Sequence, residues 1–180
     1  MLHSVQHDIK KDIKRIAIVG PESTGKTTLA EQLAKHYNTV FVPEYAREYI
    51  GKLKKIYTLK DIEIISKKQL ELEDAKAEQA NKILFCDTNL IVSKIWAEYV
   101  FGKCPQWILD EIKNRHYNFY LLTNIDLPWV GDEQREHPNL REPLFGLYEQ
   151  ELKEKKFSFS VVSGINEERF LNAKKALENL

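Results

Sequence analysis

Residues 15–28 read RIAIVGPESTGKTT, and this stretch decides the fold. Arg15 to Val19 is a short apolar run rich in β-branched residues, which is typical of a buried parallel strand. Residues 20–27, GPESTGKT, fill every specified position of the pattern G-x-x-x-x-G-K-S/T. Beyond this pattern, Leu29 and Leu33 stand four positions apart, as on one face of a helix. A strand, a glycine-rich loop and a helix in this order predict a phosphate-binding loop.

The residues of this loop have separate roles in the prediction. Gly20 and Gly25 can adopt backbone conformations closed to other residues, so peptide N–H groups can approach phosphate oxygens. We expect Lys26 to contact the β- and γ-phosphates of ATP and Thr27 to offer its hydroxyl to Mg²⁺. The expected nucleotide-binding residues of the loop are Gly20, Glu22, Ser23, Thr24, Gly25, Lys26, Thr27 and Thr28. An ordinary strand–turn–helix connection is the alternative, and the complete pattern in this context favours nucleotide binding.

Further strands are expected at residues 40–42, 83–86, 119–122 and 157–162. Helices are expected at residues 26–37, 59–82, 91–100, 105–115 and 144–155, with a last helix capped by Asn166. Because strands alternate with helices, we predict a three-layer α/β/α fold of the P-loop NTPase type with a five-stranded parallel sheet. No internal repeat or Gly/Ser linker divides the chain, so residues 15–180 are expected to form one domain after a polar leader at 1–14.

The composition excludes several classes of protein. The 180 residues include 27 Lys+Arg and 27 Asp+Glu, so the net charge is zero and a polybasic nucleic-acid binder is not expected. No apolar stretch approaches the roughly 20 residues that cross a bilayer, and residues 1–14 lack the apolar segment of a signal peptide. We therefore expect a cytoplasmic protein without nucleic-acid or membrane partners. Cys86 and Cys104 lack metal-site spacing, and Cys86 is expected to be a core thiol.

Asp87 follows the apolar run ILFC at the end of the third expected strand. In a parallel sheet of this kind, the carboxyl end of that strand lies beside the phosphate-binding loop. Its carboxylate could therefore hold a Mg²⁺-bound water. The alternative is a cap for the helix that starts near Thr88, and the two roles are compatible.

Residues 43–49, PEYAREY, begin at the carboxyl end of the second expected strand, where ligands bind in open α/β sheets. Glu44 could accept the proton of a substrate hydroxyl, and Arg47 would face the same cleft one helical turn later. The two side chains could equally form a surface ion pair at i, i+3 spacing. The nearby rings of Tyr45 and Tyr49 favour a pocket that binds a ring, so Tyr45 is also expected to contact substrate.

Residues 128–143 are rich in charge and proline and follow the fourth expected strand. Such a segment is often only a solvated surface. Kinases of small molecules carry a lid over ATP at this place, and lid arginines can stabilise the charge of the transferring phosphoryl group. Arg135 and Arg141 are the candidate lid arginines. Trp129 could stack on a planar ligand or belong to the core.

Four segments together resemble the ribosylnicotinamide kinase domain of NadR-type proteins. They are GPESTGKTTLAEQLAKHYNTVFVPEYAREYI (20–50), ILFCDT (83–88), DLPWVGDEQR (126–135) and the late ERF (168–170). The resemblance implies a nucleoside-kinase-like fold with a lid, which transfers phosphate from ATP·Mg²⁺ to the 5′-hydroxyl of nicotinamide riboside, a step of NAD synthesis. It also implies that Glu44 and Arg47 line the acceptor site, that Arg135 belongs to the lid, and that Trp129 and Asp132 contact the substrate or the lid.

The chain departs from this family in two places. Larger members carry a DNA-binding region and a nucleotidyltransferase domain, for which the residues before the first strand leave no room, so neither role is expected here. Members often have Asp-Thr-Asp at the third strand end, whereas this chain has Asp87, Thr88 and Asn89, which leaves the acceptor open. By analogy, the loop near Ser163 and Gly164 is expected to flank adenine.

The sequence thus predicts a kinase whose base is Glu44 or Asp87, with a preference for Asp87. That preference follows from the expected closeness of Asp87 to the γ-phosphate in this topology. The alternatives are a kinase of another nucleoside or small alcohol, or a regulatory ATPase that acts on a protein partner.

Overall fold

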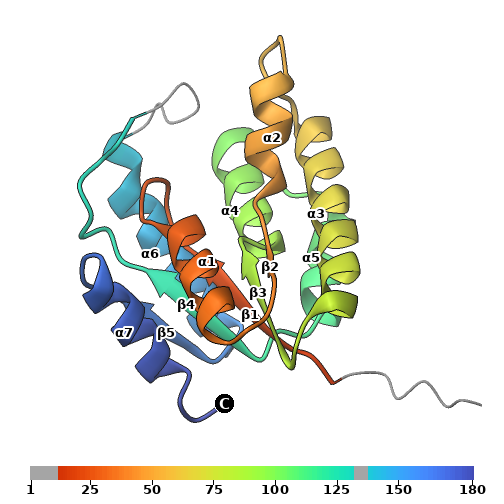
Figure 1. Ribbon diagram of the computed structural model, residues 1–180. Coiled ribbons are helices and arrows are strands. Elements are labelled where there is room, and N and C mark those ends of the chain that lie inside the picture. Colours follow the sequence, from red (N-terminus) through yellow and green to blue (C-terminus); the bar gives the residue numbers. More distant parts are fainter. Residues whose placement is uncertain (1–11, 132–137) are drawn as a thin grey trace, which may run out of the picture.

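The computed structural model describes residues 12–131 and 138–180. Within these residues, one parallel sheet contains the five strands β1 (Lys14–Val19), β2 (Phe41–Val42), β3 (Ile83–Asp87), β4 (Phe119–Thr123) and β5 (Phe159–Val162). Their order across the sheet is β2-β3-β1-β4-β5 (Figure 1). Because β1 lies between β3 and β4, the carboxyl ends of these three strands meet at one edge of the sheet. The predicted parallel α/β fold is confirmed.

Helices cover both faces of the sheet (Figure 1). One face packs against α1 (Lys26–His36) and α7 (Glu167–Ala176). The other face packs against α3 (Leu59–Gln79), α4 (Leu90–Phe101), α5 (Gln106–Asn114) and α6 (Arg141–Glu154). The short helix α2 (Tyr45–Lys52) stands above the carboxyl edge of β2, and a 3₁₀ turn (Pro138–Leu140) precedes α6.

The apolar run of β1 is buried on both sides. Ile16 and Ile18 pack in the cluster that contains Leu33 of α1, whereas Ala17 and Val19 pack in the opposite cluster. Alternate side chains of a strand point to opposite faces, so a strand covered by helices on both faces needs apolar residues throughout. This explains why the run has no polar alternation. Cys86 lies in the same kind of environment on β3 and is fully buried, as predicted.

Two predicted boundaries are wrong near α6. The strand β5 begins at Phe159 rather than residue 157, because Lys156 adopts a left-handed φ of 56° and the N–H of Phe157 donates to Leu152 O to close the helix. The helix begins at Arg141 rather than residue 144. Pro143 is tolerated there because the first helical turn leaves its N–H groups without intrahelical partners.

The helix caps also differ from expectation. Asn89 caps α4, because its Oδ1 accepts from the N–H of Ile91 over 3.1 Å. Asp87 is therefore available for another role. Asn166 stands at the start of α7 as predicted, but its side chain makes no capping hydrogen bond.

A capping box begins α3 and ties it to α2. Asp61 accepts from the N–H of Thr58 over 2.7 Å and from its hydroxyl over 2.6 Å. Tyr49 of α2 donates its hydroxyl to the same carboxylate over 2.8 Å. The bonds from Thr58, then Tyr49, lower the pKa of Asp61 to about 2. The carboxylate thus links α2 to the start of α3, two helices that flank the larger cleft described below.

In the described parts of the chain, none of the helices combines the length and apolar character of a membrane-spanning segment.

Candidate active site

The loop between β1 and α1 depends on two glycines. Gly20 has a φ of 143°, and a Cβ atom there would lie 2.4 Å from Thr123 Oγ1 at the end of β4. Gly25 has a φ of 75°, and its Cβ would lie 2.9 Å from Cδ1 of Leu127. Both positions combine a left-handed φ with close packing, so only glycine fits without strain. The loop is therefore built for close approach of the backbone to a ligand.

Side chains of the loop fold back onto its own backbone. Lys26 donates from Nζ to Pro21 O over 2.8 Å, so its ammonium group lies over the concave loop. Thr24, which is fully buried, donates from Oγ1 to the same carbonyl over 2.8 Å and lies 2.7 Å from Thr123 Oγ1. Peptide N–H groups, a helix N-terminus and a lysine at one point form an anion site suited to phosphate groups.

Asp87 and Thr27 meet beside this loop, as predicted. The hydroxyl of Thr27 donates to Asp87 Oδ2 over 2.5 Å, and Asp87 is fully buried. Its other oxygen, Oδ1, is buried and has no hydrogen-bond partner among the described residues. Burial first, and then the charge of Glu44, raise the pKa of Asp87 to about 6. An orphaned, buried carboxylate oxygen beside a hydroxyl fits a cation such as Mg²⁺.

The remaining ligands of such a cation would come from phosphate oxygens and water. Among residues 12–131 and 138–180, no group of three or more His, Cys, Asp or Glu side chains is arranged to hold a metal ion. Mg²⁺ is commonly bound by one or two carboxylates together with substrate phosphates. Thr27 and Asp87 therefore suit a cation that arrives with a nucleotide.

Two clefts meet at the phosphate-binding loop. The smaller has a volume of about 430 Å³ and is lined by residues 22–28, the start of α2 and Asp87. The larger has a volume of about 730 Å³ and lies between α2, α3, α4 and α6. Lys26 and Glu44 line both clefts. A phosphate group bound at Lys26 would therefore face the larger cleft directly.

Glu44 and Arg47 take different places at the entrance. Glu44 is half-buried at the start of α2 and lines both clefts, whereas Arg47 is exposed and lines only the smaller one. Tyr45 lines neither cleft. Its N–H donates to Gln69 Oε1 over 2.8 Å, and its ring packs against Tyr49 with centroids 6.1 Å apart. The structure thus brings Glu44 and Arg47 to the site and leaves Tyr45 beside it.

Three aromatic residues of the larger cleft were not predicted from the sequence. Trp96 of α4 donates from Nε1 to the hydroxyl of Tyr57 over 2.9 Å, and buried Tyr148 comes from α6. They lie on three separate segments, and no local pattern marks them as neighbours. They give the larger cleft an aromatic lining, which suits a planar group.

The start of the predicted lid contacts the phosphate-binding loop. Arg141 donates from Nη1 to Leu127 O over 2.8 Å and to Ser23 O over 3.3 Å. Its guanidinium carbon also lies 5.8 Å from the centre of the Trp129 ring. The N–H of Val130 donates to Ser23 Oγ over 2.9 Å. The described part of the segment therefore contacts the phosphate-binding loop, while the predicted residues Asp132 and Arg135 lie outside the described residues.

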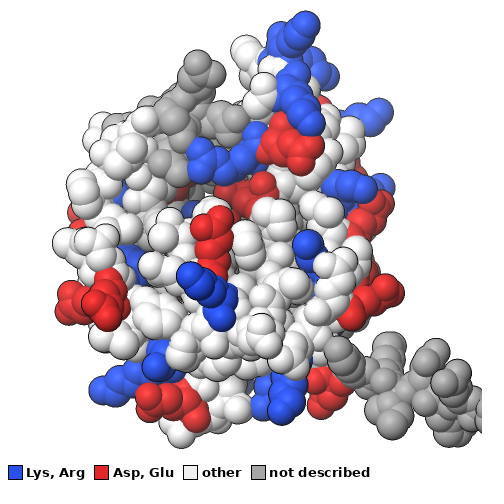
Figure 2. Space-filling model, in the orientation of Figure 1, with Lys and Arg blue, Asp and Glu red and all other residues white. Residues whose placement is uncertain are grey.

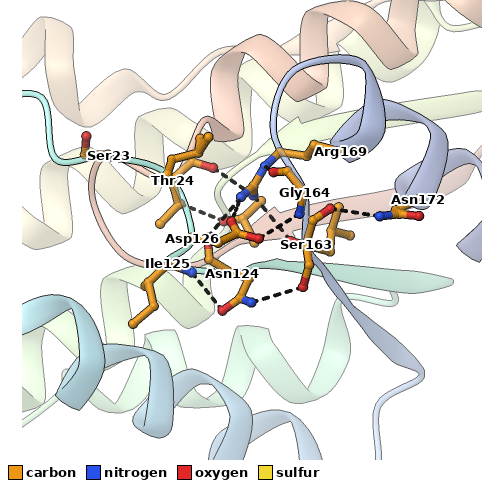
Figure 3. A network of polar contacts seen from close by, with 12 residues as sticks. Ser23, Thr24, Asn124, Ile125, Asp126, Ser163, Gly164, Arg169 and Asn172 are labelled. Carbon is orange, nitrogen blue, oxygen red and sulfur yellow. Dashed lines mark hydrogen bonds and ion pairs between the residues drawn. The ribbon is translucent and has the colours of Figure 1, made fainter.

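Arg169 is a buried polar residue that the site prediction omitted. Its guanidinium lies among backbone oxygens at the carboxyl edge of the sheet, and burial lowers its pKa although Asp126 opposes the shift (Figure 3). The sequence did contain a signal, since Arg169, Ala173 and Leu177 follow i, i+4 spacing and all three are buried. An arginine among apolar residues on the buried face of a helix indicates that buried polar groups lie next to that face.

The chain has recognisable relatives among known proteins. A family model, AAA_28, described as an AAA domain, matches residues 15–169. The trifunctional NAD biosynthesis/regulator proteins NadR of Salmonella typhimurium and Escherichia coli are each 28% identical to the chain over 127 residues, which is 68% of this chain and 31% of theirs. The chain thus spans about a third of the length of these curated relatives.

Solved structures share the architecture. A NadR protein in complex with NR has a TM-score of 0.80 at 23% identity, covering 93% of this chain and 49% of that chain. A deoxyadenosine kinase from M. mycoides has a TM-score of 0.61 at 17% identity, covering 92% of this chain and 100% of that chain. A thymidylate kinase from Ehrlichia chaffeensis has a TM-score of 0.60 at 15% identity, covering 90% of this chain and 96% of that chain. Together with the family match over residues 15–169, the phosphate-binding loop and the parallel sheet identify the chain as a member of the AAA_28 family of AAA domains.

Proposed function

We propose that the chain is an ATP-dependent phosphotransferase that phosphorylates a hydroxyl group of a nucleoside, with nicotinamide riboside as the acceptor. The observation that carries this proposal is the meeting of two clefts at Lys26 and Glu44. A nucleotide in the smaller cleft would present its terminal phosphate to an acceptor in the larger one. The names of the NadR relatives and the NR bound in a NadR structure support the choice of acceptor.

The nucleotide side of the proposal uses the loop and its neighbours. Lys26 contacts the β- and γ-phosphates, and the loop N–H groups hold the remaining phosphate oxygens. Thr27 and Asp87 hold Mg²⁺, which when bound neutralises phosphate charge. The cation and Lys26 both favour the ionised form of Asp87 and so counter the burial that raises its pKa.

We assign the base to Glu44 rather than to Asp87, which the sequence favoured. Glu44 lines both clefts, so its carboxylate can reach a hydroxyl in the larger one. Asp87 lines only the smaller cleft and already accepts from Thr27. Most of the rate acceleration comes from positioning the two substrates and from neutralising the charge of the phosphates. Phosphoryl transfer needs little covalent chemistry from the protein.

The lid residues complete the nucleotide site in this proposal. Arg141 lies against the phosphate-binding loop, from which a small movement would bring its guanidinium to a phosphate. Trp129 stacks beneath Arg141 and would shield that arginine from water. Arg135 and Asp132 remain proposed lid and substrate contacts.

A nucleoside monophosphate is the second candidate acceptor. Lys54 and Lys55 line the larger cleft, and an acceptor that already carries a phosphate would bring a negative charge to them. Figure 2 shows positive side chains gathered at the tip of α2, while charges of both signs are mixed over the rest of that face. The chain has no net charge, yet positive side chains are concentrated at one place on this face.

A panel assay tests the acceptor. The chain is incubated with ATP·Mg²⁺ and, separately, with nicotinamide riboside, other ribonucleosides, deoxynucleosides and nucleoside monophosphates, and products are detected by mass. We expect the highest kcat/KM for nicotinamide riboside. A higher value for another acceptor would keep the kinase assignment and change the substrate, whereas ADP release that no acceptor stimulates would point to a regulatory ATPase.

A further inference from the structure

The guanidinium of Arg169 joins three segments of the nucleotide site. Its side chain is 5% exposed, and every nitrogen donates to an oxygen. Nε donates to Gly164 O over 2.9 Å, Nη1 to Thr24 O over 3.1 Å and Val162 O over 3.3 Å, and Nη2 to Asn124 O over 3.2 Å and to the carboxylate of Asp126 (Figure 3). These acceptors belong to the phosphate-binding loop, the end of β4 and the β5–α7 loop.

The contact with Thr24 O reaches the backbone of the phosphate-binding loop itself. In a trans peptide, the carbonyl and the N–H point in opposite directions. Holding the Thr24 carbonyl on the side of Arg169 therefore turns the N–H of Gly25 away from Arg169. Gly25 has a left-handed φ of 75° and, as a glycine, can adopt other backbone conformations, so the contact with Arg169 restricts the orientation of this peptide.

Asp126 holds the other two segments to the same arginine. One oxygen of its carboxylate bonds to Arg169, and Oδ2 accepts from the N–H of Gly164 over 2.7 Å. Asp126 immediately precedes Leu127, whose side chain packs against Gly25 and whose carbonyl accepts from Arg141. The segment that leads into the lid is thus joined to the loop that follows β5.

Arg141 and Arg169 bind consecutive carbonyls of the phosphate-binding loop, Ser23 O and Thr24 O. Each arginine also binds backbone oxygens between Asn124 and Leu127. The two arginines therefore hold adjacent peptides of the phosphate-binding loop and also bond to the segment that leads into the lid.

We propose that Arg169 and Asp126 form a positioning pair, which sets the peptides of the phosphate-binding loop and so determines the affinity for nucleotide. Neither side chain needs to touch the nucleotide. The pair acts through the Gly25 N–H and through the position of residues 124–127, which lead into the lid. The inference rests only on the nucleotide-binding part of the proposed function and is independent of the acceptor.

Lysine cannot replace this arginine. A guanidinium offers five N–H donors in a fixed planar fork, whereas an ammonium offers three donors at one point. Arg169→Lys keeps the positive charge but cannot bond Gly164 O, Thr24 O and Asp126 together. The variant therefore tests the effect of the hydrogen-bond geometry of Arg169 without a change in its charge.

Arg115 provides the matched control. It is 15% exposed and bonds to Glu73 and Asp74, next to Arg15 at the amino end of β1. Arg115→Lys disturbs a comparable arginine–carboxylate network at the opposite edge of the sheet. It reports the loss of stability that any such change produces.

The test measures binding of a fluorescent ADP analogue and thermal unfolding for each variant. We expect Arg169→Lys to weaken nucleotide binding by about tenfold or more, because bonds to charged groups contribute roughly that much. Arg115→Lys should lower the melting temperature yet bind nucleotide within about twofold of the wild type, since distant sites act independently. If Arg169→Lys loses stability but binds as tightly as Arg115→Lys, the residue is only structural and the inference is wrong.

A second variant keeps the test decisive if Arg169→Lys does not fold. Asp126→Asn keeps an oxygen for Arg169 but lacks a second acceptor for the Gly164 N–H. We expect it to weaken nucleotide binding severalfold, and binding within twofold of the wild type would overturn the inference. If the wild-type chain itself binds no nucleotide, the proposed function fails first, so the two failures are distinguishable.

Discussion

The hydroxyl of Thr27 donates to Asp87 Oδ2 over 2.5 Å, while Asp87 Oδ1 is buried without a partner among the described residues. We expect Asp87→Asn to lower the apparent Mg²⁺ affinity or the turnover by about 10- to 100-fold, the usual effect of losing a residue that orients a metal site. A Mg²⁺ titration of product formation at fixed ATP measures this. Thr27→Ser keeps the hydroxyl and serves as the control. An unchanged Mg²⁺ dependence in Asp87→Asn would remove Asp87 from the metal site.

Glu44 lines both clefts, which makes it the proposed base. We expect Glu44→Gln to lower kcat by about 10²-fold or more, the contribution typical of general base catalysis, with little change in nucleotide binding. Glu48→Gln is the matched control, because Glu48 is exposed one turn further along α2 and bonds to Lys52. Equal turnover of the two variants would exclude Glu44 as the base.

Gly20 has no room for a side chain, since a Cβ would lie 2.4 Å from Thr123 Oγ1 at a φ of 143°. We expect Gly20→Ala to lower the stability by about 1 to 3 kcal/mol and to weaken nucleotide binding. Gly146 of α6 has nothing within 4 Å of its Cβ position, and Gly146→Ala should raise the stability by about 0.5 to 1 kcal/mol. Chemical denaturation measures both. A destabilised Gly146→Ala would contradict the open position of Gly146, and an unchanged stability of Gly20→Ala would contradict the close packing of Gly20 against Thr123.

Asp61 gives the fold a defined pH dependence. Its pKa of about 2 lies below the usual value of 3.8, so the carboxylate stabilises the folded state above about pH 4, and this contribution is lost as the pH falls towards 2. We expect Asp61→Ala to cost about 1 to 2 kcal/mol near pH 7, the range for loss of a helix cap, and progressively less as the pH falls from 4. Urea unfolding between pH 7 and 3 measures the difference. Asp110→Ala, at an exposed carboxylate on α5, is the control and should show no comparable trend. A constant difference for Asp61→Ala across this range would contradict the account.

The sheet and the phosphate-binding loop could be predicted because their patterns are local. An apolar run that is followed directly by a glycine-rich loop predicts a strand and an anion-binding site without information from the rest of the chain. Element ends were less accurate, because the closure of α6 at Lys156 and Phe157 depends on backbone hydrogen bonds that no residue pattern shows.

The proposed division of roles between Glu44 and Asp87 required the structure. Glu44 follows β2 and Asp87 ends β3, and these neighbouring parallel strands end at the same edge of the sheet, so the sequence offered both as the base and favoured Asp87 only from its expected closeness to the γ-phosphate. Only the arrangement of α2 over the larger cleft distinguishes them. Trp96, Tyr57 and Tyr148 were missed for a similar reason, since they converge from three segments that are distant in sequence. The predicted contacts of Asp132 and Arg135 stay predictions.

The ratio of ADP released to nicotinamide mononucleotide formed tests the central claim most directly. The chain is incubated with ATP·Mg²⁺ and nicotinamide riboside, and both products are quantified in the same sample. Lys26→Ala is the inactive control, and Lys35→Ala, at an exposed position of the same helix, is the active one. The account predicts one ADP for each mononucleotide, with both products absent in Lys26→Ala. ADP release without the mononucleotide, or unchanged product formation by Lys26→Ala, would contradict it.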